Sequence, residues 1–248
     1  MLKILFSPSE DKSVTSPYKN IFKDSLWACE KFQNRKECIS IYNKILFDKN
    51  EKELQKLFGL KNKKEINEFL PVDFAVCKTQ KAVLRYTGVA YANLEYASLD
   101  INAQEFIDKN VMIFSNLFGP VLAGDKVPYY KLKQGENLRG FDTALHYKKV
   151  FSDKIDEWIE EDFVVDLRAV FYGKFYSLKK PHVTIKFYKN GKILSHFAKV
   201  YRGIVLRDLA VHKPQNISDF EQINFENLYI KEIKKTTLKT EYSFEIKG

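Results

Sequence analysis

The chain has 248 residues, 45% of them hydrophobic, which is enough to bury the core of one large domain. No stretch approaches the roughly 18 to 20 apolar residues of a membrane span, and the opening MLKILFSPSEDK turns acidic too early for a signal peptide. Cys29, Cys38 and Cys77 match no zinc-binding spacing and are typical of reduced thiols. We therefore expect a single cytoplasmic domain over residues 1–248, monomeric, with no membrane contact, metal or cofactor.

The net charge of +9 is concentrated in one part of the chain. Residues 165–215 contain eleven Lys and Arg but only two acids, whereas the rest of the chain contains 30 bases and 30 acids. Aromatic residues are interleaved with the bases, a pattern that favours binding to nucleic acid or another phosphate. Lysine-rich stretches also serve as solvated surface, so both interpretations stay open at this point.

In chain order, the first predicted element is a buried strand at residues 2–6, which stops at a Ser-Pro turn. Residues 18–70 have the periodicity of helices, and Gly59 is placed to end one of them. A second buried strand is predicted at residues 111–115. The Gly-rich segment 119–126 does not qualify as a phosphate-binding P-loop, because an Asp separates its second Gly from the Lys and no hydroxyl residue follows.

The second half of the chain begins with an amphipathic helix predicted at residues 141–161 and a third buried strand at 163–167. A helix from about residue 200 to 213 is expected later, and two C-terminal segments, LYIKEI and YSFEIK, are predicted to pair as antiparallel strands. The fold class that follows is α/β of mixed α+β character. It is a single compact domain with a central mixed sheet, an N-terminal helical region and a late β-hairpin.

The late hairpin is indicated by the pair Asn190-Gly191, which favours a two-residue type I′ turn. With this turn, the residue numbers of each cross-strand pair add up to 381, so that Val183 faces Ala198. The same register puts His196 on the apolar face, where a hydrogen-bonded core histidine is favoured over a metal ligand.

Polar and charged residues follow each of the three predicted buried strands, where ligands bind in α/β sheets. Lys199 and Arg202 add two cations on one face of the next helix, because they are three residues apart. The candidate pocket residues are Ser7, Glu10, Lys12, Ser115, Asn116, Tyr130, Lys131, Arg168, Tyr172, Lys199 and Arg202. The alternative is a structural network of ion pairs, such as Arg168 with Asp166 or Glu10.

Five blocks of sequence follow one another between residue 2 and about residue 209: LFSPSEDK, AVLRYTGVAYANL, FSNLFGPVLAGDKVPYYKLKQG, VVDLRAVFY and HFAKVYRGIVLRDL. In this order they resemble the YaaA family, the bacterial peroxide-stress proteins. The chain departs from the family pattern at Asn116, where Gly is usual, at Lys131, where Arg is usual, in residues 119–124, which lack the common Leu-Arg-Pro, and in its short tail. Asn116 restricts the loop, since Gly would permit positive φ, and Lys131 keeps the charge without the bidentate fork of Arg.

The resemblance implies a compact α/β fold particular to the family, with a helix-hairpin-helix-like element that binds double-stranded DNA. It also implies a role in limiting free intracellular iron and oxidative DNA damage under hydrogen peroxide. In this sequence the candidate element is residues 84–94, where Gly88 would turn between two short helices with Arg85 beside it. A plain helix C-cap at Gly88 is the alternative.

Two functions follow as hypotheses. The first is a non-enzymatic DNA-binding protein of the peroxide response. Its phosphate contacts would come from Lys12, Arg85, Gly88, Lys131, Arg168, Lys174, Lys199, Arg202 and Arg207. The second is an enzyme or small-molecule binder with a cationic pocket for a phosphate-bearing or other anionic ligand, although the sequence contains no recognisable catalytic constellation. Cations that converge in a closed pocket favour the second function, and cations spread over an exposed face favour the first.

Overall fold

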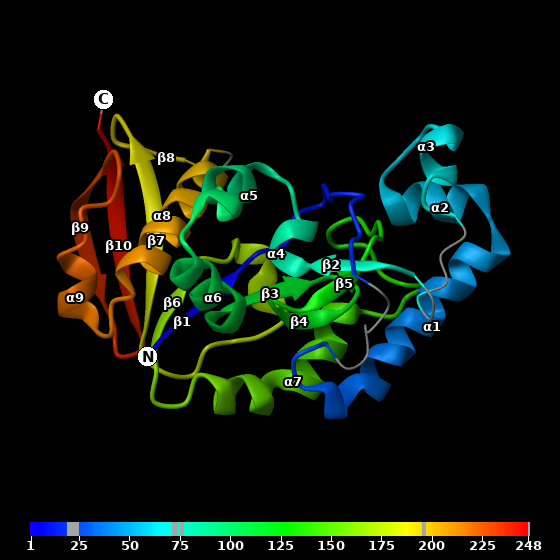
Figure 1. Ribbon diagram of the computed structural model, residues 1–248, viewed down its shortest axis with the longest axis horizontal. Coiled ribbons are helices and arrows are strands. Elements are labelled where there is room, and N and C mark those ends of the chain that lie inside the picture. Colours follow the sequence, from blue (N-terminus) through cyan, green and yellow to red (C-terminus); the bar gives the residue numbers. More distant parts are fainter. Residues whose placement is uncertain (19–24, 71–73, 75–76, 195–196, 248) are drawn as a thin grey trace.

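A mixed sheet organises the chain in the computed structural model, which describes residues 1–18, 25–70, 74, 77–194 and 197–247 (Figure 1). Its strands, in order across the sheet, are β4 (Gly119–Leu122), β3 (Val111–Ser115), β1 (Leu2–Phe6), β6 (Phe163–Asp166), β7 (His182–Lys189), β10 (Lys239–Ile246) and β9 (Leu228–Lys235), with β8 (Lys192–Ile193) beside β7. Neighbours from β3 to β10 run parallel, whereas β4 and β9 pair antiparallel at the edges. A small second sheet pairs β2 (Thr79–Lys81) with β5 (Lys126–Pro128).

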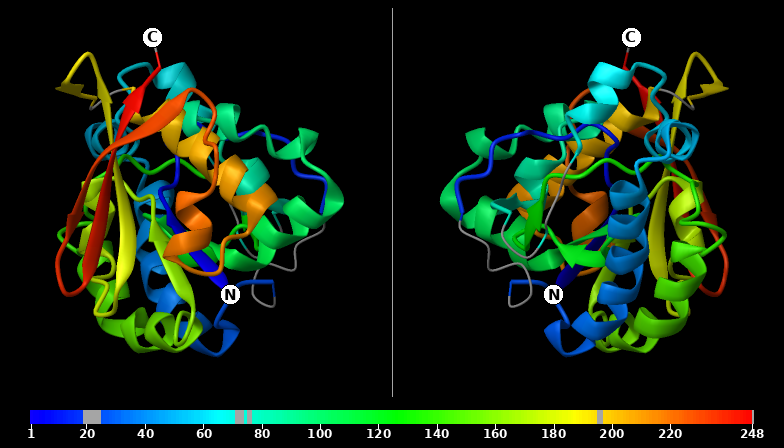
Figure 2. Two further views of the ribbon diagram at one scale, coloured as in Figure 1. Left: turned by 90° about the vertical axis from the view of Figure 1, so that its left-hand side faces the viewer. Right: turned by 90° about the vertical axis from the view of Figure 1, so that its right-hand side faces the viewer.

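Helices cover both faces of the large sheet. Figure 2 shows α6 and α8 on one face and α7 on the other. The α-helices are α1 (Phe32–Asp48), α2 (Glu51–Phe58), α3 (Lys63–Asn67), α4 (Ala82–Arg85), α5 (Val89–Leu94), α6 (Ile101–Asn110), α7 (Thr143–Trp158), α8 (Ala198–His212) and α9 (Ile217–Glu221). The 3-10 helices are η1 (Cys29–Lys31), η2 (Tyr96–Ser98) and η3 (Val170–Lys174). The chain therefore has the mixed α/β architecture that its sequence predicts.

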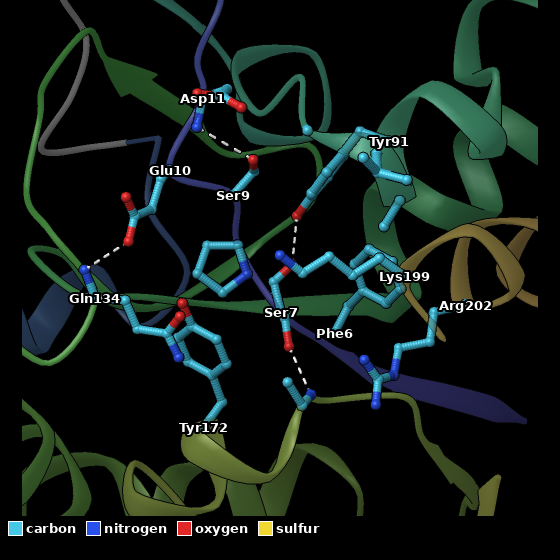
Figure 3. A pocket seen from close by; sticks show the side chains of 15 residues that line it. Phe6, Ser7, Ser9, Glu10, Asp11, Tyr91, Gln134, Tyr172, Lys199 and Arg202 are labelled. Carbon is cyan, nitrogen blue, oxygen red and sulfur yellow. Dashed lines mark hydrogen bonds between the residues drawn. The ribbon is translucent and has the colours of Figure 1, made fainter. Parts of the chain in front are cut away.

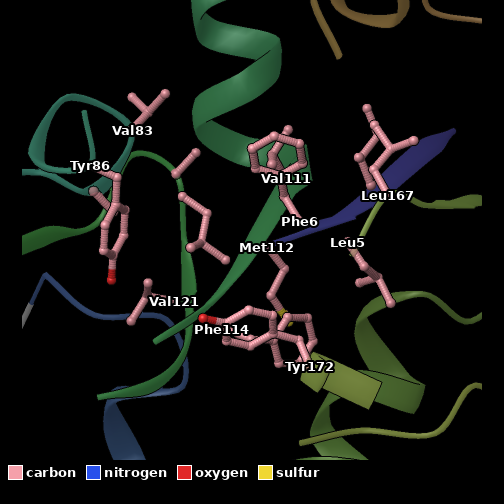
Figure 4. Close-up of a cluster of buried hydrophobic side chains, with 14 of the residues drawn as sticks. Leu5, Phe6, Val83, Tyr86, Val111, Met112, Phe114, Val121, Leu167 and Tyr172 are labelled. Carbon is pink, nitrogen blue, oxygen red and sulfur yellow. The ribbon is translucent and has the colours of Figure 1, made fainter. Parts of the chain in front are cut away.

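The three predicted buried strands are confirmed as β1, β3 and β6. Every residue of β3 is buried, and in β1 only Lys3 is partly exposed. Strands of a parallel sheet that has helices on both faces are buried on both sides, which explains their continuous apolar runs. Figure 4 shows side chains from these strands, Leu5 and Met112 among them, packed in the core.

Local signals set the ends of the helices. The Asp142 carboxylate accepts a hydrogen bond from the Leu145 N–H and starts α7 at Thr143, two residues later than the periodicity predicts. Gly59 ends α2 with a φ of 68°, as expected of a glycine at this position. The predicted N-terminal helical region is present as α1, α2 and α3, and begins at η1 within its described part.

The late hairpin has the predicted turn but a shorter second strand. Asn190 and Gly191 have φ values of 50° and 74°, and the pairs Tyr188–Ile193 and Lys189–Lys192 have the predicted sum of 381. The predicted partner of Val183, however, is wrong. Ala198 is the first residue of α8, and Val183 pairs instead with Val165 of β6 and Thr240 of β10.

The reason lies in the edges of β7. One edge is fully taken by β10, and β6 takes the other edge at its N-terminal end, so β8 can pair only near the turn. The predicted position of His196 lies outside the described residues. The predicted C-terminal pair is confirmed as β9 and β10, which run antiparallel.

Two glycines allow α5 to pack closely against its neighbours. A Cβ atom on Gly203 of α8 would lie 2.1 Å from the Ala90 carbonyl oxygen, and a Cβ atom on Gly88 would lie 2.1 Å from the Ser9 hydroxyl. At Gly203 only glycine lets the two backbones approach so closely, whereas at Gly88 the close neighbour is the Ser9 side chain. As a result, α5 and the first half of α8 lie beside the loop that follows β1.

Candidate functional site

A cavity of about 320 Å³ lies at the C-terminal end of β1 (Figure 3), and we call it the β1 cavity. Its lining residues are 6–11, from the last residue of β1 into the following loop, 88–91, from the N-cap of α5 into its first turn, and Gln134, Ala169, Tyr172, Lys199 and Arg202. β1 lies between β3 and β6 in the sheet. After β1 the chain first adds β3 and β4 on one side of this strand, and then adds β6 and β7 on its other side. The β1 cavity therefore lies at a topological switch point, where open α/β sheets bind their ligands.

Ser7 joins the two loops that form the floor of the cavity. Its hydroxyl oxygen accepts a hydrogen bond from the Ala169 N–H at 2.8 Å, and its carbonyl oxygen accepts one from the Tyr91 hydroxyl at 2.8 Å. The loop after β1 is thereby held against both the segment after β6 and helix α5. Ser7 thus fixes the shape of the cavity.

Lys199 and Arg202 supply positive charge to the cavity from the first turns of α8 (Figure 3). Neither makes a hydrogen bond or ion pair with another described residue. Burial lowers the pKa of Arg202, and the nearby Asp166 carboxylate opposes that shift. A guanidinium nevertheless stays charged at neutral pH. Two cations therefore line the cavity without a hydrogen-bond or ion-pair partner in the described part of the chain.

The opposite side of the cavity is polar and acidic. One carboxylate oxygen of Glu10 accepts a hydrogen bond from the backbone N–H of Gln134 at 3.0 Å. Figure 3 shows Glu10, Gln134 and Tyr172 grouped across the cavity from Lys199 and Arg202. Burial raises the pKa of Tyr172 above its usual value, so its hydroxyl stays neutral. The cavity thus has one cationic side and one side with hydrogen-bonding and acidic groups.

Several predicted pocket residues lie outside the lining of the cavity, in a network whose tyrosine and serine side chains are buried and whose lysines are partly buried. The Tyr130 hydroxyl is 2.8 Å from the Ser115 hydroxyl and 2.9 Å from that of Tyr86. The Lys12 ammonium lies 4.3 Å from the centre of the Tyr130 ring and donates to two backbone carbonyls, those of residues 9 and 10. Lys131 is partly buried and near enough to Lys12 to disfavour its charge. These residues support the loop after β1.

The environment of Lys12 leads to a prediction for pH. Burial, followed by Lys131, lowers the pKa of Lys12 to about 7. Above that pH the folded chain has released a proton that the unfolded chain keeps up to its ordinary pKa of about 10.4. The free energy of unfolding should therefore rise between about pH 7 and pH 10, by up to about 1.4 kcal/mol per pH unit. Urea unfolding of the wild type and of Lys12→Met across this range tests this, because the variant should lack this contribution; equal pH slopes would contradict it.

Two of the predicted DNA-contacting arginines make internal contacts. Arg85 is completely buried, and its guanidinium donates to carbonyl oxygens of the loop after β1 and of β5, including that of Val127. Arg168 forms two hydrogen bonds to the Asp166 carboxylate, at 2.9 and 2.8 Å, with only 4% of its side chain exposed. For Arg168 the alternative of a structural ion pair with Asp166 is thus the arrangement observed.

Other predicted residues are separated from the β1 cavity. Arg207 reaches the end of α5, where it donates to the Leu94 carbonyl at 3.0 Å and the Ser98 hydroxyl at 2.9 Å. Lys174 and Asn116 line a separate cavity of about 50 Å³. Lys174 is 5.1 Å from the centre of the Phe171 ring. Among the predicted residues, the β1 cavity brings together Ser7, Glu10, Gly88, Tyr172, Lys199 and Arg202.

Nine of the fifteen lining residues are not among the predicted site residues, and Tyr91, Gln134 and Ala169 are three of them. Gln134 reaches the cavity because its backbone N–H binds Glu10, a contact across 124 residues that leaves no local sequence pattern. Tyr91 does carry a signal, since it lies in the AVLRYTGVAYANL block. Around it, residues 84–94 form the end of α4, a three-residue connection and α5, and the DNA-binding role predicted for this segment remains untested.

The described residues contain no group of three or more His, Cys, Asp and Glu side chains placed to hold a metal ion. In the same part of the chain, no helix combines the length and apolar character needed to cross a membrane.

Comparisons with known proteins identify the family. The family model described as peroxide stress protein YaaA matches residues 2–234. An uncharacterized protein of Campylobacter jejuni is 43% identical over 245 residues, which cover 99% of both chains. A UPF0246 protein of Streptomyces coelicolor is 30% identical over half of each chain. A UPF0246 protein of Fusobacterium nucleatum is 24% identical over 92% of this chain and 93% of the relative. The chain belongs to the YaaA family of peroxide stress proteins.

Proposed function

We propose that this member of the peroxide stress family binds double-stranded DNA, with Lys199 and Arg202 as phosphate contacts. The observation that carries the proposal is the pair of cations that line the β1 cavity and form no hydrogen bond or ion pair with another described residue. A guanidinium fork and a neighbouring ammonium suit the oxygens of one phosphate group.

The positive charge of residues 165–215 supports DNA binding when the basic residues that form ion pairs within the chain are set aside. Lys179 pairs with Asp156 and Lys186 pairs with Glu241, each at 2.8 Å. Arg168 and Arg207 are likewise held by internal partners, as described above. Lys199 and Arg202 are the two cations of this stretch that line the β1 cavity, and neither forms a hydrogen bond or ion pair with another described residue.

A link to peroxide stress follows from the physics of DNA. The phosphates of a duplex hold a layer of condensed cations, which a protein releases when it neutralises those phosphates with Lys and Arg. Iron(II) held in that layer would be displaced by the bound protein. We propose that limiting iron at the DNA surface in this way reduces oxidative damage when peroxide is present.

The experiment is a titration of a fluorescently labelled duplex with the wild-type protein at several salt concentrations. Saturable binding is expected, with log K falling by roughly 0.9 for each phosphate contacted per tenfold rise in salt. Binding that does not change with salt, or an absence of binding at low salt, would contradict the proposal.

A second function, binding or turnover of a free anionic small molecule, is favoured by one specific observation. The cations converge on a cavity at the switch point of the sheet, where enzymes of this architecture bind small ligands. A ligand that binds only the folded state raises its stability. Thermal unfolding with inorganic phosphate or mononucleotides tests this function. A rise in the melting temperature supports it, and an unchanged melting temperature at millimolar ligand contradicts it.

A further inference from the structure

We infer that the β1 cavity holds a single nucleotide that has left the DNA duplex. This inference rests on the proposed DNA binding and names the part of the DNA that enters the site. A cavity of about 320 Å³ has the size of small-ligand sites, roughly 300–1,000 Å³, and cannot admit a duplex. Lys199 and Arg202 line the cavity itself. A nucleotide whose phosphate binds these two side chains therefore has its sugar and base at the cavity.

Rings that could contact a base are held in place before any ligand arrives. Tyr91 is fixed by its hydrogen bond to the Ser7 carbonyl and packs edge-on against Phe6, with ring centres 5.5 Å apart. Tyr172 packs against Phe175, with ring centres 5.9 Å apart. All three of Phe6, Tyr91 and Tyr172 line the cavity. Extruded bases are held against aromatic and apolar side chains of this kind.

The charges of the two sides give the nucleotide one orientation. Glu10 uses one carboxylate oxygen for the Gln134 N–H, while its other oxygen and the Gln134 side chain bind no other described residue. A carboxylate repels phosphate but accepts hydrogen bonds from the amino groups of cytosine, adenine and guanine. The phosphate therefore lies at Lys199 and Arg202, and the edge of the base lies at Glu10 and Gln134.

Extruding a nucleotide from a paired duplex costs the energy of unpairing and unstacking, and this cost is smaller when the nucleotide is already unpaired. A site of this kind consequently discriminates between DNA forms. We expect a duplex with one extra, unpaired cytosine to bind at least about tenfold more tightly than the fully paired duplex of the same length.

The experiment compares both duplexes by fluorescence anisotropy with the wild type, Val89→Trp and Val211→Trp. Val89 lines the cavity and Val211 does not, although both are 50% exposed, so they make a matched pair. The wild type and Val211→Trp should prefer the unpaired cytosine. In Val89→Trp the indole should obstruct the cavity, so the ratio of the two affinities should fall towards one.

Two outcomes would overturn the inference. The first is equal affinity of the wild type for the two duplexes, and in that case salt-sensitive duplex binding would leave the proposed function intact. If free cytidine monophosphate also binds tightly in that case, the cavity is a small-molecule site. The second is the same preference in Val89→Trp and the wild type. Failure to bind either duplex at low salt would instead contradict the proposed function itself.

Discussion

Replacing both Lys199 and Arg202 by alanine is expected to weaken binding to duplex DNA by roughly 30-fold or more at constant salt. The two side chains provide the unpartnered positive charge of the β1 cavity, and two charged hydrogen bonds to phosphate together contribute about 2 kcal/mol or more. Because neither side chain contacts another described residue through a hydrogen bond or ion pair, the folded state should lose little stability. Anisotropy titration of a labelled duplex measures the affinity, and urea unfolding checks the fold.

The matched control is Lys61→Ala/Lys64→Ala, which removes the same charge at the opposite end of the molecule. Both lysines are exposed, at and before the short helix α3 (Figure 1). The control should bind duplex DNA nearly as well as the wild type. Equal losses in the two double variants would mean that net charge, rather than the α8 cations, determines the affinity.

Substituting Gly203 by alanine is expected to lower the free energy of unfolding by about 2–3 kcal/mol and to weaken DNA binding as well. The new Cβ would lie 2.1 Å from the Ala90 carbonyl oxygen and 3.0 Å from its carbon, so a backbone and not a flexible side chain must move. Separating α5 from α8 displaces Lys199 and Arg202 from the loop after β1. Urea unfolding and the duplex titration measure the two effects.

Gly173→Ala is the control for this substitution, because a Cβ at Gly173 meets nothing within 4 Å. It should change the stability by only a few tenths of a kcal/mol. A Gly203→Ala variant as stable as Gly173→Ala would show that the close approach of α5 and α8 is not needed for the fold.

The parts of the fold that follow from local sequence were predictable. Continuous apolar runs identify β1, β3 and β6, and the Asn190-Gly191 pair identifies a tight turn. The length of β8 was not predictable, since β6 occupies the N-terminal part of the same edge of β7. Strand register follows from the turn, but the extent of pairing follows from which strands compete for an edge.

The site shows the same division between local and long-range information. The three-residue spacing of Lys199 and Arg202 predicts that they lie on one face of a helix, and both line the β1 cavity. Nothing local distinguishes them from Arg85 or Arg168, whose guanidiniums are satisfied by carbonyls and a carboxylate of the folded chain. A basic side chain is most available to an anion where folding leaves it without an internal hydrogen bond or ion pair.

If the two α8 cations bind phosphate, the salt dependence of duplex binding will show it directly. Plots of log K against log salt for the wild type and Lys199→Ala/Arg202→Ala should differ in slope by about 1.8, which corresponds to two lost phosphate contacts. Parallel lines for the two proteins would contradict phosphate binding by Lys199 and Arg202, because the cations of the β1 cavity would then make no contact with DNA.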